Sequence, residues 1–498
     1  METAYENLSK SELIALAEEQ AFEIEKLKIE LDQCKRLIYG AKSERFVPQA
    51  HPEQTMLELG LEFAPEPAGT TERVSYTRRK PKKRSTPHGR KPFPAHLQRI
   101  EHVIEPDEDV TGLKKIGSEV TEALEYVPPT YHVIRFIRPK YAKPKDEGVL
   151  IAALPFRPVE RGSFGPGFLA HLILSKCVDH LPLYRQRQQF ARQGVELALS
   201  TLADNFAAGV NALAPLFDLH RRRVLSGDYL QVDESPIQVL DRSIKRRSHR
   251  GQMWVYHDPL GRQVLFDYRI GRGREGPADM LQNYAGALQT DGYSVYDEFG
   301  KRPGIIALAC MAHARRYFEK ALDSDPARAQ YALLEIQKLY AIEHEAREAG
   351  LSFAARHGLR YQKARPLLDA FESWMKQQLV APDFRPKSQI GTAVGYALKR
   401  WPELCRYLDD GRYEIDNNLV ENAIRPLALG RKNYLFAGSH NGAMRLAVVY
   451  SLAATAKLHG IDPFAWLRDV LTRIAGHPYN QLADLLPINW QPPEAQVD

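Results

Sequence analysis

The chain has 498 residues, of which 44% are hydrophobic and 26% are charged, so it is long enough for roughly three or four domains with buried cores. It has neither an N-terminal apolar segment of the signal-peptide type nor an apolar run long enough to span a bilayer, which predicts a cytoplasmic protein without a membrane partner. Because the net charge is only +6, a surface that binds a polyanion must come from local clusters of cations.

The first 46 residues predict a coiled-coil dimerisation helix. Apolar or small residues, with one glutamine, recur at alternating spacings of four and three residues, at Leu13, Ala17, Gln20, Ile24, Leu27, Leu31, Cys34 and Ile38. A single polar residue in such a seam suits register selection, which favours a parallel dimer over a helix packed on its own domain. An ordinary amphipathic helix would show the same pattern. We expect a homo-oligomer.

Residues 47–100 are predicted to be a linker followed by a basic arm. The run that begins at Thr77, "TRRKPKKRSTPHGRKP", contains eight Lys and Arg residues, three prolines and no acid, so it cannot fold alone. A solvated tail is one interpretation, but a flexible basic arm is also attracted to a phosphate backbone. The residues that we expect to contact DNA are Arg78, Arg79, Lys80, Lys82, Lys83 and Arg84.

Two further modules precede the main domain. Residues 101–160 are rich in β-branched and aromatic residues ("TYHVIRFIRPKY") and predict a small strand-rich module. Residues 161–226 have a helical pattern with breaks at Pro182 and Gly194, and the pair Ser200/Thr201 is placed to cap a helix. This pattern fits a DNA-binding helix-turn-helix, although a generic helical hairpin has the same punctuation.

Residues 227–312 change to a strand pattern. The runs "DYLQVDESPIQVLD", "GQMWVYHDP" and "RQVLFDYRI" predict an antiparallel meander. A helix, "GPADMLQNYAGAL", leads to a fourth strand that ends at "QTDGY", and "IIALAC" supplies a fifth, which together predict a mixed α/β sheet. Residues 313–410 show only helical patterns, so we expect an all-helical insertion before the second part of the same domain, at 411–476, and a C-terminal tail at 477–498.

Three acids stand at informative places in this pattern. Asp233 lies on the first strand, Asp291 ends the fourth strand, and Glu421 begins a later helix. Phosphodiester chemistry needs such a set, because two divalent cations about 4 Å apart must be held by oxygen ligands. Each acid alone is better explained as a turn or capping residue, with Asn418 as the N-cap in the case of Glu421. Together, with basic residues around them, they favour a metal-dependent nucleic-acid enzyme.

Four motifs make this interpretation more specific. The segments "QVDESPIQVL", "LQTDGYSVYDEF", "CMAHARRYFE" and "IDNNLVENAIRPLALGRKNYLFAGS" resemble the signature blocks of DDE transposases of the insertion-sequence sixty-six family. The segment "KCVDHLPLYRQRQQFARQGVELALSTLADNF" is similar to the helical segment that precedes the catalytic domain in that family. The resemblance covers most of the chain, from the heptad segment with "YGAKSERF" to about residue 474.

The resemblance implies an RNase H-like catalytic core interrupted by a helical insertion. Asp233, Asp291 and Glu421 match the DDE acids, which would hold two Mg²⁺ ions, with Mn²⁺ as a substitute. Water would hydrolyse a phosphodiester at a transposon end, and the freed 3′-hydroxyl would attack target DNA. The implied partners are double-stranded DNA, as element ends and as target, a second copy of the chain, and accessory proteins of the same element.

The chain departs from the family at one place. Many members resemble a zinc-knuckle protein around "VIRFIRPKY", with paired cysteines, but this chain has no cysteine from Thr77 to Pro158, so we expect no zinc. Its four cysteines are far apart, which also excludes a disulfide framework. Cys310 and His313 make an incomplete metal pair, so we expect His313 to be hydrogen-bonded near the sheet.

Further cations surround the three acids in sequence. Arg315 and Arg316 are expected to face DNA or the insertion, and Arg425, Arg431 and Lys432 to contact phosphates, unless they pair with acids such as Asp416. Together, the three acids and the family resemblance predict a bacterial-type, nucleoid-associated DDE transposase. Two alternatives remain: a catalytically silent DNA-binding protein derived from such an enzyme, and a structure-specific nuclease on the same fold.

Overall fold

The computed structural model describes residues 100, 130–142, 149–160, 162–241 and 247–493. The expected coiled coil, the linker and the basic arm with its six DNA-contacting cations lie outside the described residues. The chain divides into two compact units, one formed by Thr55–Ala152 and the other by the rest of the chain.

The described part of the smaller unit contains one short antiparallel strand pair. Strands β1 (Lys140–Ala142) and β2 (Val149–Ile151) place Tyr141 opposite Leu150. The Arg138 guanidinium donates to the Ala152 carbonyl over 2.9 Å, which ties the ends of the ribbon together. These strands fall within the segment where strand structure was predicted.

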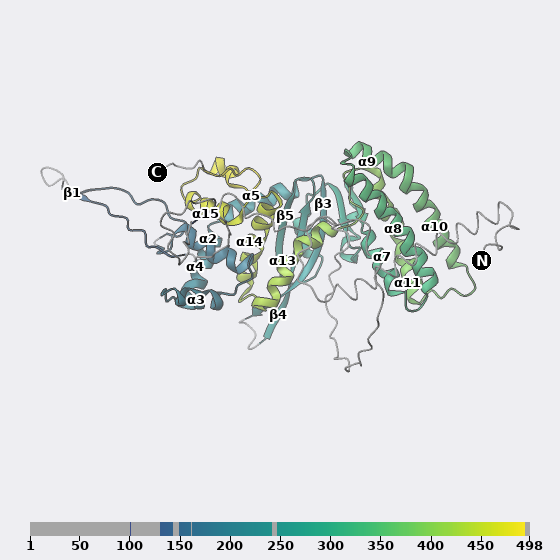
Figure 1. The fold of residues 1–498 in the computed structure, drawn as a ribbon, viewed down its shortest axis with the longest axis horizontal. Coiled ribbons are helices and arrows are strands. Elements are labelled where there is room, and N and C mark those ends of the chain that lie inside the picture. Colours follow the sequence, from purple (N-terminus) through teal and green to yellow (C-terminus); the bar gives the residue numbers. More distant parts are fainter. Residues whose placement is uncertain (1–99, 101–129, 143–148, 161, 242–246, 494–498) are drawn as a thin grey trace, which may run out of the picture. The chain divides into compact units, whose positions relative to one another are not determined.

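A mixed five-stranded sheet forms the centre of the larger unit (Figure 1). Its strands, β3 (Tyr229–Asp241), β4 (Arg247–Asp258), β5 (Gln263–Arg269), β6 (Gly286–Thr290) and β7 (Ile305–Ala309), lie in the order β5-β4-β3-β6-β7. The first three are antiparallel, whereas β6 and β7 run parallel to β3. The predicted meander and the two further strands are confirmed.

The helix expected before the fourth strand is shorter than predicted. Helix α6 (Glu275–Met280) ends early, because the last residues of "GPADMLQNYAGAL" belong to β6. Gly286 opens that strand with φ 142°, a backbone conformation that favours glycine. Two short 3₁₀ helices, η3 (Ser294–Tyr296) and η4 (Phe299–Lys301), connect β6 to β7.

The two faces of the sheet pack against different cores. Leu230, Val232 and Tyr256 belong to one core, whereas Val239 and Phe266 belong to another, as expected from the alternation of side chains along strands. The second face is covered by α13 (Asn418–Tyr434) and α14 (His440–Leu458), which lie along the strands in Figure 1. Glu421 is therefore carried by a helix that packs on the same face as alternate residues of β3.

In the described part of the chain, the helices that precede the sheet are α2 (Pro166–Cys177), α3 (Leu183–Arg192), α4 (Leu199–Asn211) and α5 (Ala214–Leu225). The breaks at Pro182 and Gly194 fall between helices, as predicted. The expected cap is wrong, because α4 begins before Ser200 and has Ala198 as its N-cap, without a side-chain hydrogen bond. These helices share a core with α14 and α15 (Pro463–Arg473).

The segment predicted as a C-terminal tail is packed in its described part. It forms the 3₁₀ helix η7 (Tyr479–Leu485), and Leu482, Leu485 and Trp490 are buried in the core shared with α15. The Trp466 indole on α15 donates to the Leu485 carbonyl over 3.0 Å.

Residues 313–410, the predicted all-helical insertion, contain no strand, and the first helix of this region begins two residues earlier, at Met311. The elements are α7 (Met311–Lys320), α8 (Pro326–Glu348), α9 (Phe353–Leu359), the π-helix η5 (Arg360–Ala364), α10 (Arg365–Leu379), α11 (Gln389–Lys399), α12 (Trp401–Cys405) and η6 (Arg406–Asp409). They enclose their own core, to which the sheet contributes Tyr229 and Leu308.

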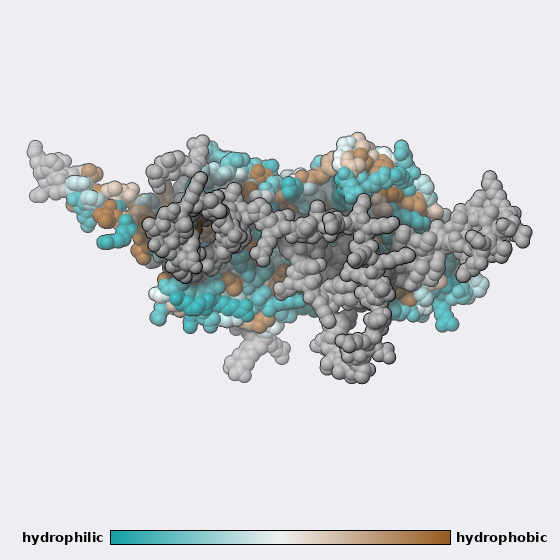
Figure 2. Space-filling view, viewed as in Figure 1, coloured by the Kyte–Doolittle hydropathy of each residue, from teal (hydrophilic) through white to brown (hydrophobic). Residues whose placement is uncertain are grey.

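The described surface on the face drawn in Figure 2 is largely hydrophilic, with apolar residues scattered among polar ones. Among the described helices, none combines the length and the apolar composition that a membrane span requires.

Candidate active site

Asp233 and Asp291 come from neighbouring parallel strands. Gln231 of β3 lies opposite Gln289 of β6, and continuing that register by two residues places Asp233 beside Asp291. Parallel strands bring their carboxyl ends to the same edge of a sheet, which is where loops can present side chains to a ligand. The register therefore brings the two aspartates to the same edge of the sheet.

Each aspartate is oriented by a local hydrogen bond. Asp233 Oδ1 accepts from the Glu234 N–H over 2.7 Å, and Asp291 Oδ1 accepts from the Tyr293 N–H over 2.8 Å. The chain turns sharply after Asp291 because Gly292 adopts φ 85°.

Glu421 joins this site from α13, with its side chain 19% exposed. Its Oε1 atom is buried and accepts no hydrogen bond within the described structure. The nearest cationic groups are Arg316 Nη2, 3.8 Å from Oε2, and the His313 ring, whose Nδ1 lies 3.8 Å from Oε1.

The capping explanation for Glu421 is wrong. Helix α13 has Asn417, not Asn418, as its N-cap, and the cap makes no side-chain hydrogen bond. Asp416 supports the start of the helix instead, because its Oδ1 accepts from the Asn418 N–H over 3.0 Å and its Oδ2 from the Asn418 amide over 2.8 Å. The Glu421 carboxylate therefore does not cap the start of α13.

The electrostatics show that the three acids share one environment. Burial, followed by the charges of Asp291, Glu234 and Glu421, raises the pKa of Asp233 well above its usual value. Burial and Asp291 also raise the pKa of Glu421, while Arg316 and Arg425 oppose the shift. A cation bound among these carboxylates would offset their repulsion.

The three acids are the right type of ligand for a divalent metal, but their side chains are not yet arranged around one. Carboxylate oxygens are the ligands that Mg²⁺ prefers, and the unpartnered Glu421 Oε1 is available as one. Within the described ranges, however, no three His, Cys, Asp or Glu side chains are close enough as they stand to hold a metal ion. The three acids would have to draw together around a cation.

His313 lies beside Glu421 as a neutral ring. Burial and the charge of Arg316 lower its pKa to about 4. Its Nε2 lies 3.2 Å from Arg316 Nη1, and a guanidinium can only donate, so Nε2 accepts and the ring proton is on Nδ1, facing Glu421. The thiol of Cys310 is buried and accepts from the Asn417 N–H over 3.4 Å, so the interpretation of a hydrogen-bonded histidine fits better than a metal pair.

The five predicted DNA-binding cations that lie in the described part of the chain have different surroundings. Arg316 and Arg425 act on Glu421 electrostatically, so they belong to the site. Arg315 pairs with Glu319 over 2.5 Å, and Arg431 donates to the Pro236 carbonyl of β3. Lys432 is exposed.

Sequence reasoning missed a buried polar layer beneath the acids. Tyr229 and Gln231 of β3 and Gln289 of β6 are all 0% exposed and are hydrogen-bonded to one another. The missed signal is a repeat, since "QVD" and "QTD" each place a glutamine two residues before an acid.

Comparisons with known proteins identify the family of the chain. The model described as "Transposase IS66 family" matches residues 161–445, "IS66 C-terminal element" matches 451–488, and "Transposase C of IS166 homeodomain" matches 26–101. Three similar proteins are uncharacterized proteins of Sinorhizobium fredii (strain NBRC 101917 / NGR234). Protein y4qI is 36% identical over 93% of this chain and 88% of its own length; y4hP is 33% identical over 93% and 88%; y4jD is 33% identical over 93% and 94%. The first model alone spans more than half of the chain, which therefore belongs to the IS66 family of transposases.

Proposed function

We propose that the protein is a DDE transposase that cuts the 3′ ends of an insertion sequence and joins them to target DNA. The observation that carries this proposal is the convergence of Asp233, Asp291 and Glu421 from two parallel strands and one helix. The sheet order, with three antiparallel and two parallel strands, supports an RNase H-like core.

In this proposal the three acids are the metal ligands. Two bound Mg²⁺ ions, or Mn²⁺ in their place, would activate the attacking oxygen and stabilise the leaving oxygen of an in-line displacement. The chain holds the acids in place: the Glu234 and Tyr293 amides each fix one carboxylate oxygen, and Arg316 attracts Glu421. The neutral His313 leaves the negative charge of the acids available for cations.

The reaction has two chemically similar steps. Water attacks the phosphorus at the element end, the bond from phosphorus to the 3′ oxygen breaks, and a 3′-hydroxyl is released. That hydroxyl then attacks a phosphorus of target DNA and displaces another 3′ oxygen, so no covalent enzyme intermediate is needed. No oxidant or reductant takes part.

DNA binding and assembly are parts of the same proposal. The homeodomain family model covers the heptad segment from residue 26 and the basic arm, which supports DNA contact near the N-terminus. Two element ends must be held together for joining, so we propose a homodimer or larger oligomer in a bacterial cytoplasm, associated with the nucleoid. Accessory proteins of the same element are a further proposed partner.

The test is cleavage and joining of a labelled duplex made from the DNA that flanks the gene. Wild type with Mg²⁺ should cut and join, whereas Asp233→Asn, Asp291→Asn and Glu421→Gln should bind the duplex and do neither. Glu298→Gln is the matched control, because Glu298 is exposed and pairs with Arg274 over 2.6 Å. It should react like wild type.

Other outcomes select between the alternatives. Cutting without joining would indicate a nuclease. Binding without reaction by every protein, with accessory proteins supplied, would favour a silent DNA-binding protein and overturn the proposal.

A further inference from the structure

Two buried arginines of the insertion hold the segment 411–417, which leads into α13. Arg356 of α9 and Arg360 of η5 have side chains 9% and 0% exposed, and both bind the Glu343 carboxylate of α8. Arg360 makes five hydrogen bonds, which matches its five N–H groups. Two go to Glu343, and three go to the carbonyls of Tyr407 (2.6 Å), Asp410 (2.9 Å) and Tyr413 (2.8 Å).

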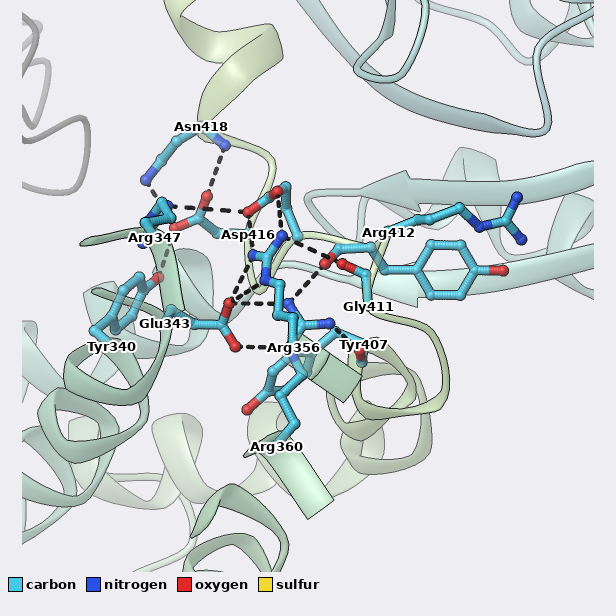
Figure 3. Close-up of polar contacts among 12 residues, drawn as sticks. Tyr340, Glu343, Arg347, Arg356, Arg360, Tyr407, Gly411, Arg412, Asp416 and Asn418 are labelled. Atoms are coloured by element: carbon cyan, nitrogen blue, oxygen red, sulfur yellow. Dashed lines mark hydrogen bonds and ion pairs between the residues drawn. The ribbon is translucent and has the colours of Figure 1, made fainter. Parts of the chain in front are cut away.

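Arg356 extends the same network to the segment itself (Figure 3). Its two terminal nitrogens donate to the Glu414 carboxylate over 2.9 and 2.8 Å, and one also reaches the Gly411 carbonyl over 3.3 Å. Gly411 lies so close to α9 that a Cβ there would be 1.9 Å from the Phe353 carbonyl oxygen. The backbone of residues 411–417 therefore packs closely against α9 at Gly411.

The charges of the four central side chains balance. The guanidinium groups of Arg356 and Arg360 face the carboxylates of Glu343 and Glu414, and the partly exposed Arg347 lies 4.0 Å from Glu414. Burial alone would raise the pKa of Glu343, but Arg360 and Arg356 hold it below its usual value, so the acid stays ionised. Because Arg360 has no exposed surface, it cannot contact DNA.

The acid-bearing strands hold the other side of the same segment. Tyr229 OH accepts from the Glu414 N–H over 3.1 Å, and Gln289 donates to the Glu414 carbonyl over 2.9 Å. Gln231 donates to the Asp416 carbonyl over 2.9 Å and accepts from the Val420 N–H over 3.2 Å. The path of the chain into Glu421 is thus fixed between the insertion and the sheet.

A second contact joins the insertion to Asp291. Tyr396 of α11 donates to the Asp291 carbonyl over 2.8 Å, and Arg400 donates to the Gly292 carbonyl over 2.9 Å. Arg400 also pairs with Asp297 over 2.5 Å, which holds the loop that follows Asp291. The insertion therefore binds the backbone next to one acid and the backbone leading to another.

We propose that Arg356, Arg360, Tyr396 and Arg400 are positioning residues, and that the helical insertion sets the placement of Asp291 and Glu421 relative to Asp233. This inference rests on the proposed function in so far as the three acids carry out the reaction. It assigns the insertion a role in the geometry of the site that is separate from any contact with DNA.

The experiment compares two mild variants of the full-length protein with a matched control. Arg360→Lys keeps the charge beside Glu343 but loses the forked contacts to three carbonyls. Tyr396→Phe loses one hydroxyl and keeps the ring, which stacks on Tyr317 at 4.4 Å. The control is Arg328→Lys, because Arg328 pairs with Asp325 and Asp383 within the insertion.

Both variants should cleave the flanking-DNA duplex more slowly, by on the order of 10- to 100-fold, because small misplacements of reacting groups are costly. Their affinity for the duplex should stay within about twofold of wild type. Hydrogen exchange without metal should speed up in residues 415–421 for Arg360→Lys and in 290–293 for Tyr396→Phe, and not in α15. The control should match wild type in every measurement.

Unchanged cleavage, or exchange that rises equally across the larger unit, would overturn the positioning role. A loss of cleavage that follows a loss of DNA affinity would do the same. If wild type itself fails to cut, the proposed function fails, and the exchange pattern then decides the positioning role by itself.

Discussion

Gln231 and Gln289 face each other across two parallel strands, with Gln231 Nε2 donating to Gln289 Oε1 over 2.9 Å. Each precedes an acid by two residues, so its side chain lies on the same face of the sheet as that acid. The hydrogen bond between the two glutamines therefore helps to fix the register of β3 and β6, two residues before Asp233 and Asp291.

Loss of this pair should destabilise the protein. Gln289→Met would remove the acceptor of the Tyr229 O–H, one acceptor of the Gln231 amide and the donor to the Glu414 carbonyl. We expect a loss of about 2–4 kcal/mol in the free energy of unfolding. Urea unfolding measures it. Gln238→Met is the control, since Gln238 is exposed on β3. Equal losses in both variants would contradict the role of the buried pair.

Removing charge from the site should stabilise the protein in metal-free buffer. The raised pKa of Asp233 means that the folded state binds a proton more tightly than the unfolded state, so stability falls as pH rises above about 3.9. Asp233→Asn should therefore be more stable than wild type at pH 7.5 by on the order of 1 kcal/mol, and the gain should vanish near pH 4.

Thermal unfolding in EDTA at the two pH values measures this difference. Asp218→Asn, at an exposed site on α5, is the control and should show no gain. If Asp233→Asn unfolds at the wild-type temperature at pH 7.5, repulsion among the three carboxylates does not destabilise the folded state.

Two buried histidines should make the protein sensitive to acid. Burial lowers the pKa of His220 and of His257 to about 4. The unfolded state binds more protons between about pH 4 and 6.5, so stability is lost as pH falls through that range, by on the order of 3 kcal/mol for each residue. His220→Gln can keep the bond to the Val264 carbonyl and should lose less stability from pH 7 to 4.5 than wild type does.

Chemical denaturation at both pH values gives the comparison. His132→Gln, at an exposed position, should leave the loss unchanged. An acid loss in His220→Gln as large as in wild type would assign the effect to other groups.

The described cysteines should resist alkylation. Burial raises the pKa of Cys177 and of Cys405 to about 12, and burial raises that of Cys310 well above its usual value. At pH 8 a thiol with such a pKa is roughly one part in ten thousand thiolate, the reactive form. Iodoacetamide followed by peptide mass spectrometry should find these three sites unmodified in the native protein and modified in guanidinium. Rapid labelling of native Cys310 would show that the segment before α13 opens readily.

The sequence was most informative where local patterns carry the structure. Alternation placed Asp233 on the correct face of β3, and the change of period located the insertion, because strand and helix periodicity are local properties. The helix caps predicted at Asn418 and at Ser200/Thr201 failed. At α13 the neighbouring Asp416 and the distant Gln231 of β3 accept from the first N–H groups, and α4 begins without a side-chain cap.

The partners of Arg356 and Arg360 could not be predicted in the same way. Their hydrogen bonds to Glu414 and Tyr413 join residues that are 58 and 53 positions apart in the sequence. Neither the amino-acid composition nor the helical periodicity of the segment identifies such pairs. A lysine or arginine on a helix is usually solvated, so buried, fully bonded arginines become visible only in the folded chain.

The contacts that close the site also have a consequence for how the chain folds. The Tyr229 hydroxyl meets the Glu414 N–H across 185 positions of sequence, and Gln231 meets Val420 across 189. During synthesis, β3 to β7 emerge before the whole insertion, so the polar groups of Tyr229 and Gln231 lack these partners until the insertion and the start of α13 have been made. Because contacts between distant residues form slowly, assembly of the acid-bearing layer should be a late step of folding.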